Sequence, residues 1–148
     1  MLIVTFWLVT IFLSAANPVA AVSGEESLQS VAKTDPSVTE KQWGIRILSL
    51  RQSAAGYMLD FRYQVTDPEK ASTVLDRKIK PYLIDQATGT KLYVPSMPKV
   101  GSLKNRVVNP DVEKTYFILF GNSRGLVKSG SKVTIVIGDF REENLVVE

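Results

Sequence analysis

The 148-residue chain contains neither cysteine nor histidine. Without cysteine it cannot form disulfides, present a thiol nucleophile, attach haem covalently or carry a lipid anchor on a cysteine. Without histidine it lacks the usual zinc and copper ligand, and it cannot assemble a Ser-His-Asp triad. The fold must therefore be stabilised by packing and hydrogen bonds alone. We predict no cofactor and no metal site.

Charge is absent from the beginning of the chain, where Leu2–Leu13 form an uninterrupted apolar run. The length of this run is typical of the hydrophobic centre of a secretory signal, whereas a membrane span needs about 20 residues. Pro18 then interrupts this hydrophobic helix, and small residues follow. We predict a signal peptide over residues 1–21, cut between Ala21 and Val22, and an exported bacterial protein that is periplasmic or extracellular. The alternatives are an uncleaved inner-membrane anchor and a buried core helix.

The next segment, residues 22–42, is polar and has no sustained apolar period, which predicts a flexible linker. The folded domain is then expected over residues 43–148. This length is sufficient for one domain with one hydrophobic core.

From Trp43 onward the sequence is dominated by alternation of apolar and polar residues, clearest over residues 57–65. A preceding alternating segment and the turn at Ala55-Gly56 predict a hairpin. Asp67-Pro68-Glu69 predicts the start of one short helix that ends near Leu75. Because Pro81 cannot donate a ladder hydrogen bond, its strand is expected at an edge or bulged. The later strands are predicted over residues 79–84, 91–94, 103–108, 115–120, 132–137 and 144–147.

Seven to eight short strands at this spacing predict an all-β domain, an antiparallel β-sandwich of two packed sheets. The sequence also resembles exported bacterial proteins that have an immunoglobulin-like β-sandwich, over most of the chain after Trp43. The resemblance implies the fold and export, and it implies no activity and no catalytic residues. The matching segments are Gly56-Tyr57, Asp60-Phe61-Arg62-Tyr63, Asp67-Pro68, Lys80-Pro81-Tyr82 and Gly138-Asp139-Phe140.

Carboxylates are the main catalytic groups that the composition leaves, but no spacing among them selects a pair suited to glycoside hydrolysis. Asp60 lies beside Arg62 on the polar face of a predicted strand, which indicates a solvated cross-strand charge. Asp139, Glu142 and Glu143 are expected in a solvated turn without the loop pattern of a calcium site. We predict no catalytic residues and no enzyme activity. A carboxylate-dependent enzyme acting on polysaccharides remains the alternative.

Positive charge is concentrated between residues 77 and 106, which contain seven basic residues and one acidic residue, Asp85. The net charge of this stretch is +6, although the whole chain carries only +3. Lys78 and Lys80 are expected on one strand face with an aromatic neighbour, and clustered charge of one sign attracts anions. The alternative is a set of solvated strand faces with lysines that protect sheet edges. The predicted binding patch is Arg77, Lys78, Lys80, Tyr82, Lys91, Lys104 and Arg106.

These observations favour a non-enzymatic accessory or binding module that contacts an envelope protein or an anionic polymer. Nucleic acid is not expected as a partner, because stacking aromatics are not interleaved with the basic residues. Membrane contact is expected only through the amino-terminal segment if it is uncleaved. The two prolines around Met97 predict an extended loop, with Met97 plugging one end of the core. The alternative is an exposed Met97 that provides an adaptable contact for a partner. A purely structural surface domain is the remaining alternative.

Overall fold

The computed structural model describes residues 36–99, 101–105, 107–112 and 114–148. The predicted signal peptide with its cut between Ala21 and Val22, the first part of the predicted linker, and Arg106 lie outside these residues. Within the described residues, no helix is both long enough and apolar enough to span a membrane.

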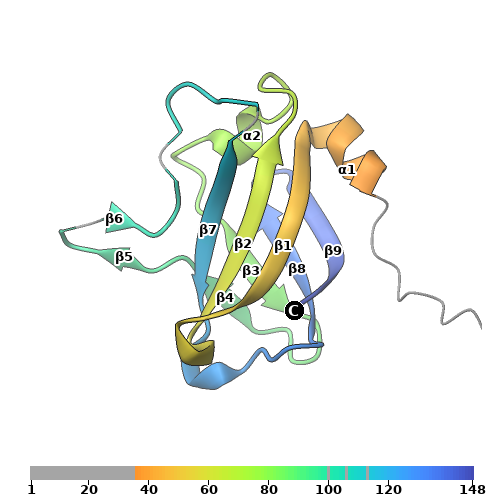
Figure 1. Ribbon diagram of the computed structural model, residues 1–148. Helices are drawn as coiled ribbons and strands as arrows, with labels where there is room; N and C mark the ends of the chain where they lie inside the picture. Colours follow the sequence, from red (N-terminus) through yellow and green to blue (C-terminus); the bar gives the residue numbers. More distant parts are fainter. Residues whose placement is uncertain (1–35, 100, 106, 113) are drawn as a thin grey trace, which may run out of the picture.

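Strands dominate the domain, and they pair antiparallel in two main sheets and one small hairpin (Figure 1). The first sheet has three strands in the order β1 (Ile45–Ser53), β2 (Met58–Val65) and β7 (Thr115–Gly121). The second sheet has four strands in the order β4 (Lys91–Tyr93), β3 (Tyr82–Asp85), β8 (Lys132–Ile137) and β9 (Phe140–Val146). The hairpin of β5 (Ser96–Met97) and β6 (Gly101–Ser102) projects from the side of the domain (Figure 1). The predictions of an all-β class and of antiparallel sheets are thus confirmed.

One hydrophobic core receives side chains from both main sheets. Alternation along β2 buries Leu59, Phe61, Tyr63 and Val65 on a single face, as expected for a strand with one side against the core. The second sheet contributes residues such as Ile135, which is fully buried. Each such large apolar side chain stabilises the fold by about 1.5–3 kcal/mol relative to exposure.

The described residues form two short α-helices, α1 (Pro36–Trp43) and α2 (Ser72–Leu75), whereas the sequence predicted one in this part of the chain. Helix α1 forms from residues that the sequence assigned to the end of the linker. The Thr39 hydroxyl donates a hydrogen bond of 2.8 Å to the buried Glu142 carboxylate, and the Trp43 ring packs edge-on against Phe140 at 5.6 Å. These tertiary contacts explain why a segment without an apolar period is nevertheless helical.

The predicted β1–β2 hairpin is confirmed, as are the strands predicted over residues 115–120 and 132–137. Three other strand predictions are wrong in part, and one of them is the strand predicted over residues 144–147, which is β9 and begins already at Phe140. Strand β3 begins only at Tyr82 and lies between β4 and β8, so it is not an edge strand. Pro81 precedes the strand and therefore removes no ladder hydrogen bond.

No strand forms over residues 103–105 or 107–108, where the sequence predicted one. Lys104 makes an isolated bridge to Ile118 of β7. At the next position, the Asn105 side-chain oxygen accepts the hydrogen bond of the Phe117 amide, which replaces a ladder bond between backbones.

Candidate functional site

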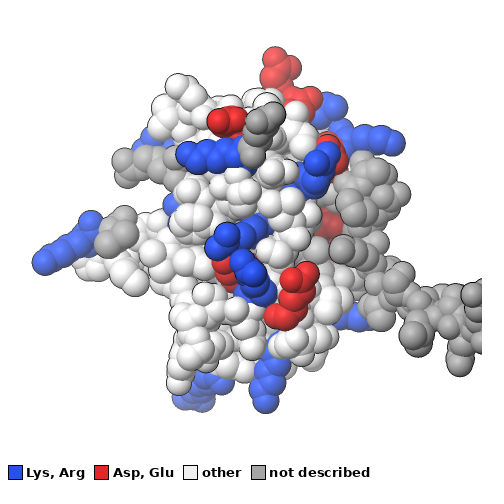
Figure 2. Space-filling model, in the orientation of Figure 1, with Lys and Arg blue, Asp and Glu red and all other residues white. Residues whose placement is uncertain are grey.

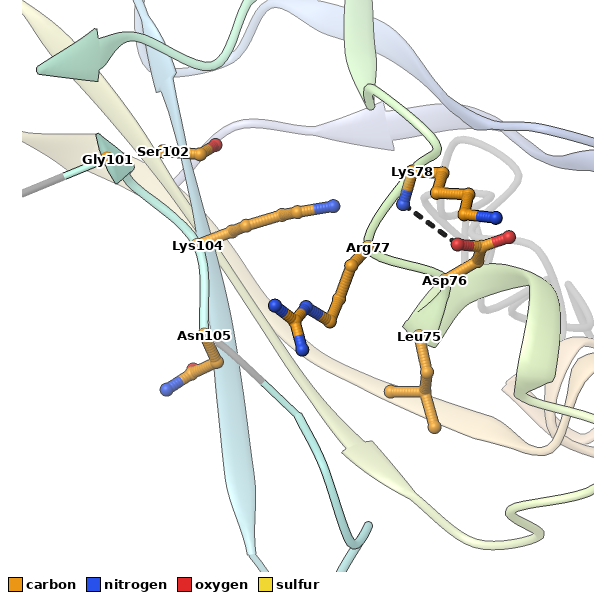
Figure 3. Close-up of a pocket in the computed structure, with 8 residues that line it drawn as sticks. All are labelled: Leu75, Asp76, Arg77, Lys78, Gly101, Ser102, Lys104 and Asn105. Carbon is orange, nitrogen blue, oxygen red and sulfur yellow. Dashed lines mark hydrogen bonds between the residues drawn. The ribbon is translucent and has the colours of Figure 1, made fainter. Parts of the chain in front are cut away.

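Two segments that are far apart in the sequence meet and line a cleft of about 800 Å³ (Figure 3). The first segment follows α2 and leads into β3, and the second includes β6 and the residues after it. A smaller cleft of about 280 Å³ shares Arg77, Lys78 and Ser102 with the first, and Lys80 and Tyr93 also line it. We call these two adjoining clefts, with Arg77, Lys78, Lys80 and Lys104, the cationic cleft.

Hydrogen bonds hold the two segments of the cleft together. Lys104 extends across the gap (Figure 3), and its Nζ donates a bond of 3.0 Å to the carbonyl oxygen of Ile79. On its other side, the Lys104 segment is attached to β7, because the Leu119 amide donates to the Leu103 carbonyl at 2.9 Å. The position of the Lys104 ammonium is therefore fixed by the sheet and by the opposite wall.

The opposite wall is shaped by Asp76. Its carboxylate accepts a bond of 2.8 Å from the backbone amide of Lys78, drawn as a dashed line in Figure 3. Asp, through such bonds to an amide two residues ahead, stabilises turns in place of regular structure. This turn explains why Lys78 and Lys80 lie in a loop and do not share the strand face that the sequence predicted.

The same wall packs against the turn between β8 and β9 at Gly138. A Cβ at this position would lie 2.9 Å from Ile79 Cδ1 and 3.1 Å from Thr73 Cγ2, and the backbone φ is +61°. Only glycine combines this left-handed conformation with so close an approach. Gly138 thus allows the segment that carries Arg77 and Lys78 to lie where it does.

Arg77, Lys78 and Lys80 are exposed, and none of them forms an ion pair with an acidic residue in the described parts of the chain. Burial lowers the pKa of Lys104, and the nearby Asp76 carboxylate partly opposes that shift. Asp76 is the only acidic residue among those described that line the two clefts.

Three arginines elsewhere in the domain have acidic partners. Arg46 pairs with Glu40, Arg62 with Asp60, and Arg141 with Glu143, at 2.7–2.9 Å. Figure 2 likewise shows acidic and basic side chains side by side over the β1–β2–β7 sheet. Arg51 and Arg124 form no ion pair with a described acidic residue, so the cationic cleft is distinguished by the grouping of four basic residues around two adjoining clefts.

The structure brings together four of the seven residues of the predicted patch, Arg77, Lys78, Lys80 and Lys104. Tyr82 and Lys91 lie on the adjacent strands β3 and β4, where the Lys91 ammonium is 5.2 Å from the centre of the Tyr82 ring. The sequence did not single out Tyr93, which lines the smaller cleft. Its place opposite Tyr82 follows from the β3–β4 register, which the Thr88-Gly89 turn signal could have suggested.

The carboxylates do not assemble a second candidate site. Asp60 is buried, contrary to the solvated position that the sequence predicted, and its Oδ2 accepts a bond of 2.9 Å from Arg62. Glu142 is also buried, beneath α1, and not in a solvated turn. Within the described residues, no three Asp or Glu side chains are grouped so that they could hold a metal ion.

Met97 is 47% exposed on the β5–β6 hairpin, so the prediction that it plugs the core is wrong. Among the described residues, its strand pairs with β6 alone, in the hairpin that projects from the side of the domain (Figure 1). The exposed Met97 agrees with the alternative interpretation of this loop.

Comparison of the chain with protein-family models, with curated proteins and with solved structures gave no match.

Proposed function

We propose that this protein is a non-enzymatic binding module that holds an anionic polymer in the cationic cleft. The observation that carries the proposal is the convergence of four cations from two distant segments on adjoining clefts with one acidic residue in their described lining. Like charges held close together repel one another, so the grouping of these charges does not by itself stabilise the domain.

An anionic ligand would relieve this repulsion and would accept charge-assisted hydrogen bonds, which are about twice as strong as neutral ones. Lys104 is suited to this role because its ammonium is held in place by Ile79 before any ligand binds. A polymer is favoured over a single small anion because the cations border two clefts that share a wall, so successive anionic groups can be bound together.

We also propose that the two sheets form an immunoglobulin-like sandwich. If β1, β2, β3, β4, β7, β8 and β9 are lettered A, B, C, C′, E, F and G, the sheets have the orders A-B-E and C′-C-F-G. Immunoglobulin domains have the orders A-B-E-D and C-F-G, so the strand order supports this fold with D missing. The segment with the β5–β6 hairpin takes the place of strand D in the chain.

The proposed place of action is the bacterial periplasm or the outside of the cell, which the apolar run Leu2–Leu13 supports. The amino-terminal residue of the protein recovered from its host tests this proposal. We expect Val22 at the amino terminus, and an intact Met1 in the exported protein would contradict cleavage.

Binding is tested with a charge-reversed variant, Lys78→Glu together with Lys80→Glu. The matched control is Lys128→Glu with Lys132→Glu, which makes the same change in net charge at exposed positions away from the cleft. Titration with polygalacturonate and polyphosphate should show at least about a tenfold loss of affinity for the cleft variant and a much smaller loss for the control. Wild-type affinity should also fall from about 0.05 M to about 0.5 M salt. Equal losses in the two variants, or salt-independent binding, would overturn the proposal.

A further inference from the structure

Two tyrosines form an aromatic surface beside the cationic cleft. Tyr82 of β3 and Tyr93 of β4 are directly opposite each other in the sheet, with ring centres 6.1 Å apart and planes inclined at 45°. We call this pair the tyrosine shelf. The Tyr93 residue is 59% exposed, so its ring is accessible to a ligand.

The shelf is continuous with the positive charge of the cleft. Tyr93 lines the smaller cleft together with Arg77 and Lys80. The Lys91 ammonium lies 5.2 Å from the centre of the Tyr82 ring, at a distance typical of cation–π contacts. The exposed Tyr93 ring and several cations are therefore presented together to any molecule that enters this cleft.

The position of Tyr93 contrasts with that of Tyr57, the other strongly exposed tyrosine, which is 65% exposed. Tyr57 follows the short 3-10 helix Ala54–Gly56 at the opposite end of β2 from Val65. Among the described residues, Tyr57 has no ring within stacking distance. Two basic side chains, Arg124 and Lys128, share its pocket, and neither belongs to the cationic cleft. Tyr57 therefore provides an exposed tyrosine outside the cationic cleft for comparison.

We propose that the anionic polymer is an acidic polysaccharide, with one sugar ring stacked on Tyr93 and the acidic group of the chain bound by Lys80 and Arg77. This inference rests on the proposed function of the cleft. The C–H bonds on a sugar face carry small positive charge and are attracted to the negative face of an aromatic ring. A carboxylate or sulfate attached to the same sugar accepts charge-assisted hydrogen bonds from the adjacent cations.

A polymer without rings, such as polyphosphate, would bind the cations without contacting the tyrosine shelf. A neutral polysaccharide, such as dextran, would contact the tyrosine shelf without providing an anion for the cations. The combination of tyrosine shelf and cationic cleft thus selects polymers that have both a ring and a negative charge in each unit.

The experiment compares wild type, Tyr93→Ala and the control Tyr57→Ala in titrations with polygalacturonate, polyphosphate and dextran. We expect Tyr93→Ala to weaken polygalacturonate binding by roughly tenfold, which is within the range for removal of one stacking aromatic from proteins that bind single-stranded nucleic acid. Polyphosphate binding should be unchanged, and dextran should bind far more weakly than polygalacturonate. Tyr57→Ala should change none of these affinities. A Tyr93→Phe variant, which keeps the ring, should bind polygalacturonate like wild type.

Equal weakening of polygalacturonate and polyphosphate by Tyr93→Ala, or no weakening of either, would overturn the sugar inference. The proposed function would still stand in that case if both affinities depended on Lys78 and Lys80. Dextran binding as tight as that of polygalacturonate would overturn the requirement for charge. Absence of wild-type binding to both anionic polymers would overturn the proposed function and this inference together. Unfolding midpoints of all variants in urea show whether an effect arises from loss of folding.

Discussion

Two polar side chains, Asn122 and Lys104, each connect loops of this domain, and they differ in how fully they are bonded. Asn122 is completely buried, and its amide nitrogen donates to the carbonyls of Gly56 and Val127 at 2.8 and 2.7 Å. Its oxygen accepts a bond of 3.0 Å from the Val127 amide. Lys104 is only partly buried and makes one such bond, to Ile79, with an ammonium that has three donors.

This difference in hydrogen bonding indicates that Asn122 stabilises the fold, whereas Lys104 is also available to bind a ligand. Asn122 is neutral and its bonds all end within the protein, so nothing remains for a partner to satisfy. Lys104 carries a charge at the wall of the cleft and retains donors for an anion. Substitution should therefore affect mainly stability at Asn122 and mainly binding at Lys104.

The largest effect is expected from Asn122→Ala. The substitution leaves the buried Val127 amide without its acceptor and removes the Asn122 donor from the carbonyls of Gly56 and Val127, although the Val127 carbonyl still accepts a bond from Gln52. It should lower the free energy of unfolding by about 3 kcal/mol. Urea denaturation measures this loss. The exposed neighbour Ser123→Ala should change stability by less than about 0.5 kcal/mol.

The comparison also requires that the loss of stability in Asn122→Ala is not accompanied by a loss of polymer affinity. The folded Asn122→Ala protein should bind polygalacturonate as wild type does, because its bonds lie at the turns around Gly56 and Val127 and not in the cleft. A stability loss below about 1 kcal/mol, or a tenfold loss of affinity in the folded variant, would show that the two roles are not separate.

Much of the fold could be predicted from the sequence because alternation is a local property of a half-buried strand. The β1–β2 hairpin has this pattern around Phe61, and β8 has an apolar run that marks a buried strand. Local pattern failed where a side chain took the place of a ladder bond and where a strand could begin only after a proline. Asn105 accepts the Phe117 amide, and Pro81 delays the start of β3, so apolar residues nearby did not form strand.

The candidate site could be predicted in part, because charge density is visible in the sequence whereas tertiary neighbours are not. The excess of basic residues predicted Lys78, Lys80 and Lys104 as a set. The bond between Lys104 and Ile79 joins positions 25 residues apart, and topology alone places them together. Tyr93 was missed because its position beside Tyr82 depends on the β3–β4 register, for which the Thr88-Gly89 turn was the one local sign.

The next largest effect is expected at Gly138. It tests whether polymer binding depends on the position of the cleft wall as well as on the charge of the cleft. Gly138→Ala adds a methyl group that must displace Ile79 or Thr73, and it also strains a backbone at φ +61°. We expect a loss of about 1–2 kcal/mol in unfolding free energy and a severalfold loss of polymer affinity, without any change in charge. Urea denaturation and polygalacturonate titration measure the two losses.

Gly130→Ala is the matched control for this substitution. Gly130 has a φ of +85° but no atom within 4 Å of an added Cβ, so only backbone strain is introduced there. It should lower stability without lowering affinity. Equal affinities of the Gly138→Ala and Gly130→Ala proteins would show that the position of the wall does not matter for binding.

The smallest effect is the pH dependence of stability and binding at Lys104. It distinguishes Lys104, which titrates, from Asn122, which does not. Burial lowers the pKa of Lys104 in the folded protein below its ordinary value of 10.5, with Asp76 opposing the shift and with Arg77 and Lys78 on the same cleft. The folded state therefore releases this proton before the unfolded state does. As pH rises from the folded pKa towards 10.5, the unfolded state binds more protons, and Lys104 should contribute increasingly to stability.

Polymer binding should change with pH in the opposite direction, because an anion binds the charged ammonium and loses that partner as the proton leaves. The quantity to measure is the difference between wild type and Lys104→Gln in urea denaturation and in polygalacturonate titration, at pH 7 and at pH 10. The stability difference should shift in favour of wild type at the higher pH, while the affinity advantage of wild type should shrink. A parallel experiment with Asn122→Ala should give differences that do not change with pH, since the amide does not titrate. If the Lys104 differences were equally constant, its charge would have no role in the cleft, and Lys104 would resemble Asn122 as a side chain that serves only the fold.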